Sequence, residues 1–145
     1  MQYMSGIHAL NTVCKLDTCG DWHASGIRWD NPLFLDSAES IWGNYGIESN
    51  KDIPYYKEGK FNVANHIRAL LDLINLNRFS VAQGMNNDYI CNEKYDQEIF
   101  EKVYELKSIK SQDDWDKIDH FMKKEYLSKW DRYKIKMEEN DNAKQ

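Results

Sequence analysis

The chain contains 145 residues, with 19 Lys and Arg against 24 Asp and Glu, for a net charge of −5. This length suits one domain, and we expect a single globular domain over 1–138 with a frayed polar tail over 139–145. Three cysteines cannot all pair within the chain, which excludes a disulfide framework and favours a reducing, cytoplasmic setting. No apolar run approaches the roughly 20 residues of a membrane helix. The acidic balance argues against direct nucleic-acid binding, which needs Lys and Arg to neutralise phosphates.

The N-terminal part of the chain predicts loops and short strands. Six of the seven Gly and both Pro lie in residues 1–59, and these residue types mark turns. Short apolar segments between the turn signals predict strands over 27–29, 33–35 and 45–47. A sheet built from such short pieces is necessarily small.

From residue 63 onward, the spacing of apolar residues predicts helices. Apolar side chains at three- and four-residue steps predict a first helix over 63–76. Asp96 is expected to cap the N-terminus of a second helix, because its carboxylate accepts amide hydrogens of the first turn.

The C-terminal region predicts the longest helix. Ser111 and Asp114 resemble a capping box, and a stripe of apolar and aromatic residues then continues to Met137. The stripe consists of Trp115, Ile118, Met122, Tyr126, Trp130, Tyr133 and Met137. We interpret this stripe as side chains that pack in the core. The alternative is an exposed ridge that anchors a partner protein. We therefore predict an α+β fold, with a loop-rich N-terminal half holding a few short strands and then about three helices, the C-terminal one long.

Four metal-ligand types cluster near the N-terminus. His8, Cys14, Cys19 and His23 lie within 16 residues, separated by five, four and three intervening residues. Zinc prefers tetrahedral sets of Cys and His, so these four form a candidate zinc site. The spacing differs from that of common zinc motifs, and the alternative is that Cys14 and Cys19 are small buried apolar residues. Cys91 either joins this site or packs elsewhere.

The segment GDWH over 20–23 offers a candidate acid–base pair. Asp21 can orient the imidazole of His23, which is the arrangement of a general base. No nucleophile motif accompanies it, such as a G-x-S-x-G elbow, a Walker A loop or an H-E-x-x-H helix. The alternative is a tight turn in which Trp22 anchors the local structure.

His66 and Arg68 are further candidates, because both lie near the positive N-terminal end of the helix predicted over 63–76. The guanidinium group of Arg68 matches a phosphate or a carboxylate, although an ion pair with Asp72 four residues later is the simpler reading. If they converge with Asp21 and His23, and with Asp88, these residues would form the site of a nuclease or phosphotransfer enzyme. The sequence does not show that they converge.

Aromatic residues make up 13% of the chain, and such residues are enriched at protein interfaces. In the N-terminal half, Trp22, Trp29 and Trp42 are candidate anchors for a protein partner.

Five segments together resemble a family of small uncharacterised bacterial proteins, some encoded near toxin–antitoxin genes. The segments are GIHALN, CGDWH, SIWGNYGIE, VANHIRALLDL and AQGMNNDYICNEKYD, and the resemblance spans residues 5 to about 130. It implies a bacterial origin and an antitoxin-like or defence-related role, and it implies no catalytic residues.

Three functions are weighed on these observations. The favoured one is a protein-binding module, antitoxin-like or inhibitory, that masks a partner such as a toxin or a nucleic-acid-processing enzyme. The alternative is a small metal-dependent hydrolase or nuclease that uses zinc at the N-terminal His/Cys/Asp cluster. The third is a DNA-binding repressor that uses basic residues over 123–136, but these alternate with acidic residues, as on a solvated helix face.

Overall fold

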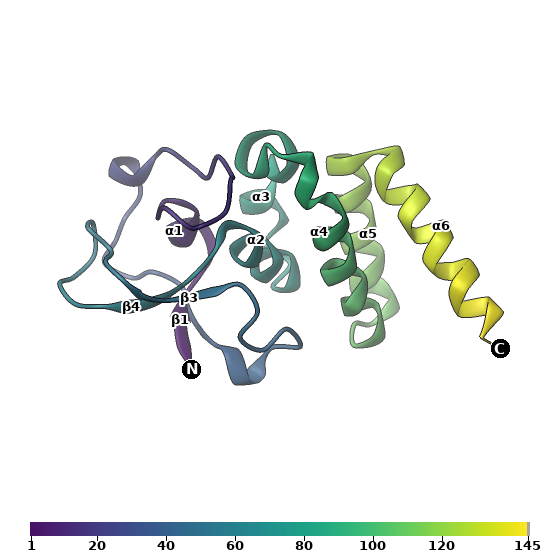
Figure 1. The fold of residues 1–145 in the computed structure, drawn as a ribbon, viewed down its shortest axis with the longest axis horizontal. Coiled ribbons are helices and arrows are strands. Elements are labelled where there is room, and N and C mark those ends of the chain that lie inside the picture. The colour runs from purple at the N-terminus through teal and green to yellow at the C-terminus, as the bar shows by residue number, and fades with distance from the viewer. Residues whose placement is uncertain (145) are drawn as a thin grey trace.

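In the computed structural model, which describes residues 1–144, a four-stranded sheet lies at one end of the molecule and the C-terminal helices lie at the other (Figure 1). The strand order is β2-β1-β4-β3, with β1 and β4 parallel and the other neighbours antiparallel. The predicted α+β class is confirmed, with 54% of residues in helices and 10% in strands. The strands are β1 Gln2–Met4, β2 Phe34–Asp36, β3 Ile47–Lys51 and β4 Phe61–Ala64.

Short helical turns separate the longer helices along the chain. The α-helices are α1 Gly6–Leu10, α2 His66–Asn75, α3 Phe79–Ala82, α4 Asp96–Tyr104, α5 Gln112–Tyr126 and α6 Ser128–Ala143. The 3-10 turns are η1 Ala24–Gly26, η2 Ser37–Glu39, η4 Glu93–Tyr95 and η5 Glu105–Ser108, and η3 Met85–Ile90 is a π-helical turn.

Helix α2 is the centre of the fold, because it lies between the sheet and the C-terminal helices (Figure 1) and contacts β4, α1, α3 and α4. Every residue from His66 to Ile74 is buried. The helix predicted over 63–76 is confirmed, but it begins only at His66 because Val63 belongs to β4, where it pairs with Met4. The side chain of Asn65 caps the helix by accepting the amide of Arg68 at 2.8 Å.

A buried ion pair on α2 connects the helix to the sheet. Arg68 is 0% exposed, and its Nε donates to Asp72 Oδ1 at 3.1 Å. Its terminal nitrogens donate to the backbone carbonyls of Gly43 and Tyr45 at 2.8 and 2.6 Å, and to the hydroxyl of Tyr3 at 2.9 Å. That hydroxyl donates in turn to Asp72 Oδ2 at 2.7 Å. The predicted pairing of Arg68 with Asp72 is confirmed, and the pair is part of the core.

The long C-terminal helix expected to reach Met137 is instead two helices. Leu127 has φ 55° and ψ −133°, which interrupts the helical conformation between α5 and α6. The chain reverses at this residue, and α6 packs back against α4 and α5 (Figure 1). Ser111 caps α5 as predicted, accepting the amide of Asp114 at 3.1 Å. The stripe packs in the core, since its residues are buried except for the partly buried Met137.

Several local predictions are wrong. Residues 27–29 form no strand, because no described strand pairs with them, and the indole N–H of Trp29 donates to the carbonyl of Ala24 at 2.8 Å. The strand predicted over 33–35 lies one residue later in β2, and that over 45–47 begins only at Ile47. Strands β1 and β4 were not predicted.

One prediction at a helix end is also corrected. Tyr95 occupies the N-cap position of α4, whereas Asp96 is the first helical residue and its Oδ2 accepts from Lys129 at 3.3 Å. The polar tail predicted over 139–145 continues α6 as far as Ala143. Gln145 lies outside the described residues.

Candidate functional site

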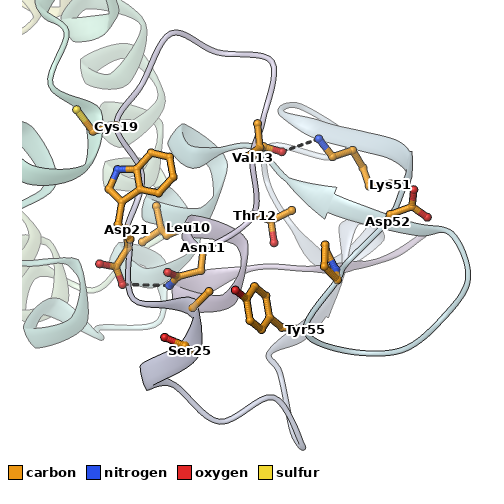
Figure 2. Close-up of a pocket in the computed structure, with 13 residues that line it drawn as sticks. Leu10, Asn11, Thr12, Val13, Cys19, Asp21, Ser25, Lys51, Asp52 and Tyr55 are labelled. Carbon is orange, nitrogen blue, oxygen red and sulfur yellow. Dashed lines mark hydrogen bonds between the residues drawn. The ribbon is translucent and has the colours of Figure 1, made fainter.

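A pocket of about 460 Å³ opens between the segment that follows α1 and the connection from β3 to β4 (Figure 2). One wall runs from the end of α1 to η1, and the other comes from residues 51–55. The lining residues are Leu10, Asn11, Thr12, Val13, Cys19, Asp21, Trp22, Ala24, Ser25, Lys51, Asp52, Pro54 and Tyr55. The lining is mostly apolar with a few polar groups, which is the usual character of a binding site.

Asn11 fixes the base of the first wall. Its side-chain nitrogen donates to Asp21 Oδ2 at 3.0 Å (Figure 2), and its side-chain oxygen accepts the amide of His23 at 2.9 Å. The amide of Asp21 also donates to the carbonyl of Leu10 at 2.8 Å. These bonds close the segment over 11–23, here called the pocket loop, onto the end of α1.

The side chain of His66 hydrogen-bonds to the middle of the pocket loop. Its Nε2 donates to the carbonyl of Thr12 at 2.8 Å, so in the neutral ring Nδ1 accepts from the hydroxyl of Thr18 at 2.7 Å. His66 is buried at the first position of α2. The imidazole predicted as a catalytic candidate therefore anchors the loop that forms the pocket wall.

Gly20 brings the pocket loop against this imidazole, and its replacement by alanine is expected to destabilise the fold by about 2–4 kcal/mol. The backbone has φ +70°, and an added Cβ would lie 2.7 Å from His66 Cε1 and 2.9 Å from the carbonyl oxygen of Leu10. Urea denaturation of Gly20→Ala measures the loss.

The matched control for Gly20→Ala is Gly26→Ala, since a Cβ at Gly26 meets nothing within 4 Å. The control is expected to stay within about 0.5 kcal/mol of the wild type. Equal stabilities for the two variants would contradict close packing of the pocket loop on His66.

The second wall, formed by residues 51–55, is fixed in place by contacts with neighbouring residues. Lys51 Nζ donates to the carbonyl of Val13 at 2.6 Å (Figure 2) and pairs with Glu48 at 2.9 Å. The ring of Tyr55 stacks on Trp29, with centroids 5.8 Å apart and an interplanar angle of 21°. Trp29 thus supports the pocket from behind rather than lining it.

Two carboxylates and one ammonium group line the pocket. The carboxylate of Asp21 is 10% exposed and hydrogen-bonds His23 Nδ1, which confirms the predicted contact between these two residues. Asp52 is an exposed second carboxylate, paired with Lys60 at 2.9 Å. The one ammonium group of the lining, that of Lys51, is already paired with Glu48.

The four predicted zinc ligands do not meet. His8 Nε2 donates to the carbonyl of Arg28 at 2.6 Å, and His23 bonds Asp21 instead. Cys14 faces the side of His66, and Cys19 contacts Cys91. Within residues 1–144, no group of three or more His, Cys, Asp or Glu side chains is placed to hold a metal ion. The reason is that His8 lies in α1, outside the pocket loop, and the loop turns its three ligands toward different neighbours.

The predicted catalytic residues also separate. Only Asp21 and His23 touch each other, while His66 is occupied by the pocket loop and Arg68 by the core ion pair. Asp88 lies in the π-helical turn η3. The five residues therefore do not form one acid–base site.

Cys14 and His66 form a second contact between titratable groups. Burial raises the pKa of the Cys14 thiol. The hydrogen bond and charge of His66 lower this pKa by a larger amount, so it lies below its ordinary value. Burial lowers the pKa of His66, and its contacts with Cys14 raise it by more. Cys14 does not line the pocket, so this pair is not placed to act on a ligand there.

The three candidate tryptophan anchors have different environments. Trp22 lines the pocket and is 80% exposed. Trp29 is partly buried beneath Tyr55. The expectation for Trp42 is corrected, because this residue is 6% exposed, donates its indole N–H to the carbonyl of Lys102 at 3.1 Å and stacks over Arg68. A buried ring of this kind is not accessible to a partner.

Sequence reasoning missed the second wall of the pocket, because residues 51–55 approach the pocket loop only through the pairing of β3 with β4. Comparisons with protein-family models, curated proteins and solved structures gave no match. Over residues 1–144, no helix combines the length and the apolar character needed to cross a membrane. The pocket is therefore the feature of the molecule that bears on its function.

Proposed function

We propose that this chain is a protein-binding module that masks a partner enzyme, in the manner of an antitoxin or inhibitor, and that it binds its partner through the pocket beside Trp22. The observation that carries this proposal is the 80% exposure of the Trp22 side chain at the rim of a preformed pocket. Tryptophan is among the residues that contribute most to binding when a partner buries it. A Trp22 side chain that is this exposed does not contribute to the packing of the fold.

The side chain that enters the pocket is basic, an arginine or a lysine of the partner. The faces of Trp22 and Tyr55 attract cations. Asp21 adds a carboxylate, whereas Asp52 is already paired with Lys60. Lys51 does not oppose this preference, because Glu48 neutralises it. Arginine is itself enriched at protein interfaces.

The class of partner follows from the same charges. A net charge of −5 steers the chain toward a basic surface, and enzymes that process nucleic acids carry such surfaces because they bind phosphates. We propose that the chain binds its partner in the cytoplasm, because cysteines there normally remain reduced. The metal-dependent hydrolase has no comparable observation in its favour, since the described residues do not gather the zinc donors.

The test compares tagged wild type with Trp22→Ala and Ile135→Ala in capture of partners from cells. Ile135 is 55% exposed on α6, away from the pocket, and serves as the matched control. We expect one partner at a fixed stoichiometry with wild type and control, and about thirtyfold weaker binding with Trp22→Ala, as for a residue contributing 2 kcal/mol. The purified partner should lose its enzymatic activity when the wild-type chain is added.

Two outcomes would overturn the proposal. Equal capture by Trp22→Ala and wild type would remove the pocket as the binding site. Undiminished activity of the partner in the complex would remove the masking function.

The preference for a basic side chain is tested without the partner. Blocked arginine should shift the NMR signal of the Trp22 indole N–H, which is assigned by its loss in Trp22→Ala. Blocked citrulline is the matched uncharged ligand, and we expect it to bind several-fold more weakly, since a cation over a ring contributes about 0.5–2 kcal/mol. Equal shifts for the two ligands would contradict the cationic occupant.

A further inference from the structure

Two exposed cysteines from distant parts of the sequence lie on neighbouring segments beside the pocket. Cys19 lies in the pocket loop, Cys91 follows the π-helical turn η3, and the two thiols are close enough for each to affect the charge of the other. The Cys91 thiol also donates to the carbonyl of Asn87 at 3.1 Å. Both cysteines are free thiols in this structure.

Hydrogen bonds on both sides of the pair hold the two segments together. The residue after Cys19 donates its backbone amide to the carbonyl of Tyr89 at 2.8 Å. The residue after Cys91, Asn92, donates its side-chain amide to the carbonyl of Asp17 at 2.9 Å. The two segments are therefore held together on both sides of the cysteines, and this brings the two thiols close to each other.

We propose that Cys19 and Cys91 form a redox site, which closes to a disulfide when the protein meets a peroxide and reopens with a thiol reductant. Closure requires the sulfur atoms to approach to a bond length of about 2.05 Å. Cys91 follows the end of η3 with φ 54°, so its movement does not break the interior of a helix. Cys14 takes no part, because it faces His66.

The chemistry balances in two steps with one peroxide. The thiolate of Cys19 attacks a peroxide oxygen, so that an S–O bond forms, the O–O bond breaks and hydroxide leaves. The Cys91 thiol gives its proton to that hydroxide, and its sulfur then attacks the sulfur of Cys19. The S–S bond forms, the S–O bond breaks, and the departing oxygen leaves as hydroxide, which takes up the proton that the Cys19 thiol released when it ionised. Two electrons pass from the two sulfurs to the peroxide.

The surroundings of the two thiols determine which of them is oxidised first. Burial, together with the hydrogen bond and the negative charge of Cys19, raises the pKa of Cys91 to about 11. The Cys91 thiol also holds its proton in a hydrogen bond to the carbonyl of Asn87 at 3.1 Å, which favours the thiol over the thiolate that reacts with an oxidant. Cys19 is the sulfur oxidised first, and Cys91 resolves it.

The bond would connect the pocket loop covalently to the helical half of the molecule. Cys19 also lines the pocket, so the bond places an oxidation-sensitive group at the proposed binding surface. This effect on binding rests on the proposed function, whereas formation of the bond does not.

The experiment oxidises the purified chain with one equivalent of hydrogen peroxide and locates disulfides by mass spectrometry without reduction. Wild type and Cys14→Ser should each lose about 2 Da and yield the one linkage between residues 19 and 91, and dithiothreitol should restore the mass. Cys19→Ser and Cys91→Ser should form no internal disulfide. Because the bond closes a loop of about 70 residues, oxidised Cys14→Ser should melt about 5–10 °C above its reduced form.

Three results would overturn the proposal. They are a linkage to Cys14 in the wild type, sulfinic acid at Cys19 without a disulfide, and disulfides only between chains. No partner is needed for any of these measurements. The redox site can thus fail while the proposed binding function stands, and the reverse also holds.

Discussion

Replacing Arg68 with alanine is expected to lower the free energy of unfolding by about 3–5 kcal/mol, because Asp72 then remains buried without its ion-pair partner. Asp72 is 3% exposed, so water does not replace the lost guanidinium. Two backbone carbonyls that accept from Arg68 also lose their donor. Urea denaturation followed by circular dichroism measures the change.

The matched control for Arg68→Ala is Arg28→Ala. Arg28 also pairs with an aspartate, Asp30 at 3.2 Å, but its side chain is 89% exposed. Exposed ion pairs contribute about 0–1 kcal/mol, so this variant should unfold nearly as the wild type does. Similar losses for both variants would show that burial does not determine the strength of the Arg68 pair.

Replacing Trp130 with alanine is expected to cost about 3–5 kcal/mol, the usual effect of truncating a large buried aromatic side chain. Trp130 is fully buried, and its ring contacts those of Phe100, Trp115 and Tyr133. Its indole N–H also donates to Asp119 at 2.8 Å. The loss is again measured by urea denaturation.

Trp22→Ala is the control for Trp130→Ala, because it removes the same side chain from an exposed position. It should change the unfolding free energy by less than about 0.5 kcal/mol. A large loss in this variant would mean that Trp22 stabilises the fold, and it would weaken the interpretation of Trp22 as a binding residue.

Helices were predicted where local sequence signals determine them. The periodic apolar residues of α2 and the Ser111 cap of α5 are local features, and the structure confirms both. Strands β1 and β4 were missed because each is stabilised by pairing with distant segments rather than by its own pattern. The break at Leu127 was missed because a leucine gives no sign of a positive φ, and the stripe keeps its three- and four-residue steps across the break.

The candidate site was predictable only in its contiguous part. Asp21 and His23 lie two residues apart, so their contact follows from the sequence. The contact of Cys19 with Cys91 depends on how η3 folds against the pocket loop, and no local signal reports it. The role of His66 was missed for the same reason, since its partners lie about 50 residues away.

The anchoring of the pocket loop by His66 and Asn11 has a consequence for the thermodynamics of association. The loop has little regular secondary structure, yet hydrogen bonds fix its two ends and its middle in the free protein. Its conformational entropy is therefore lost during folding rather than at the encounter with a ligand. Preorganised surfaces of this kind bind with a smaller ordering penalty and with backbone shifts of about 1 Å or less. Loosening the loop would weaken association even if every side chain of the pocket were kept.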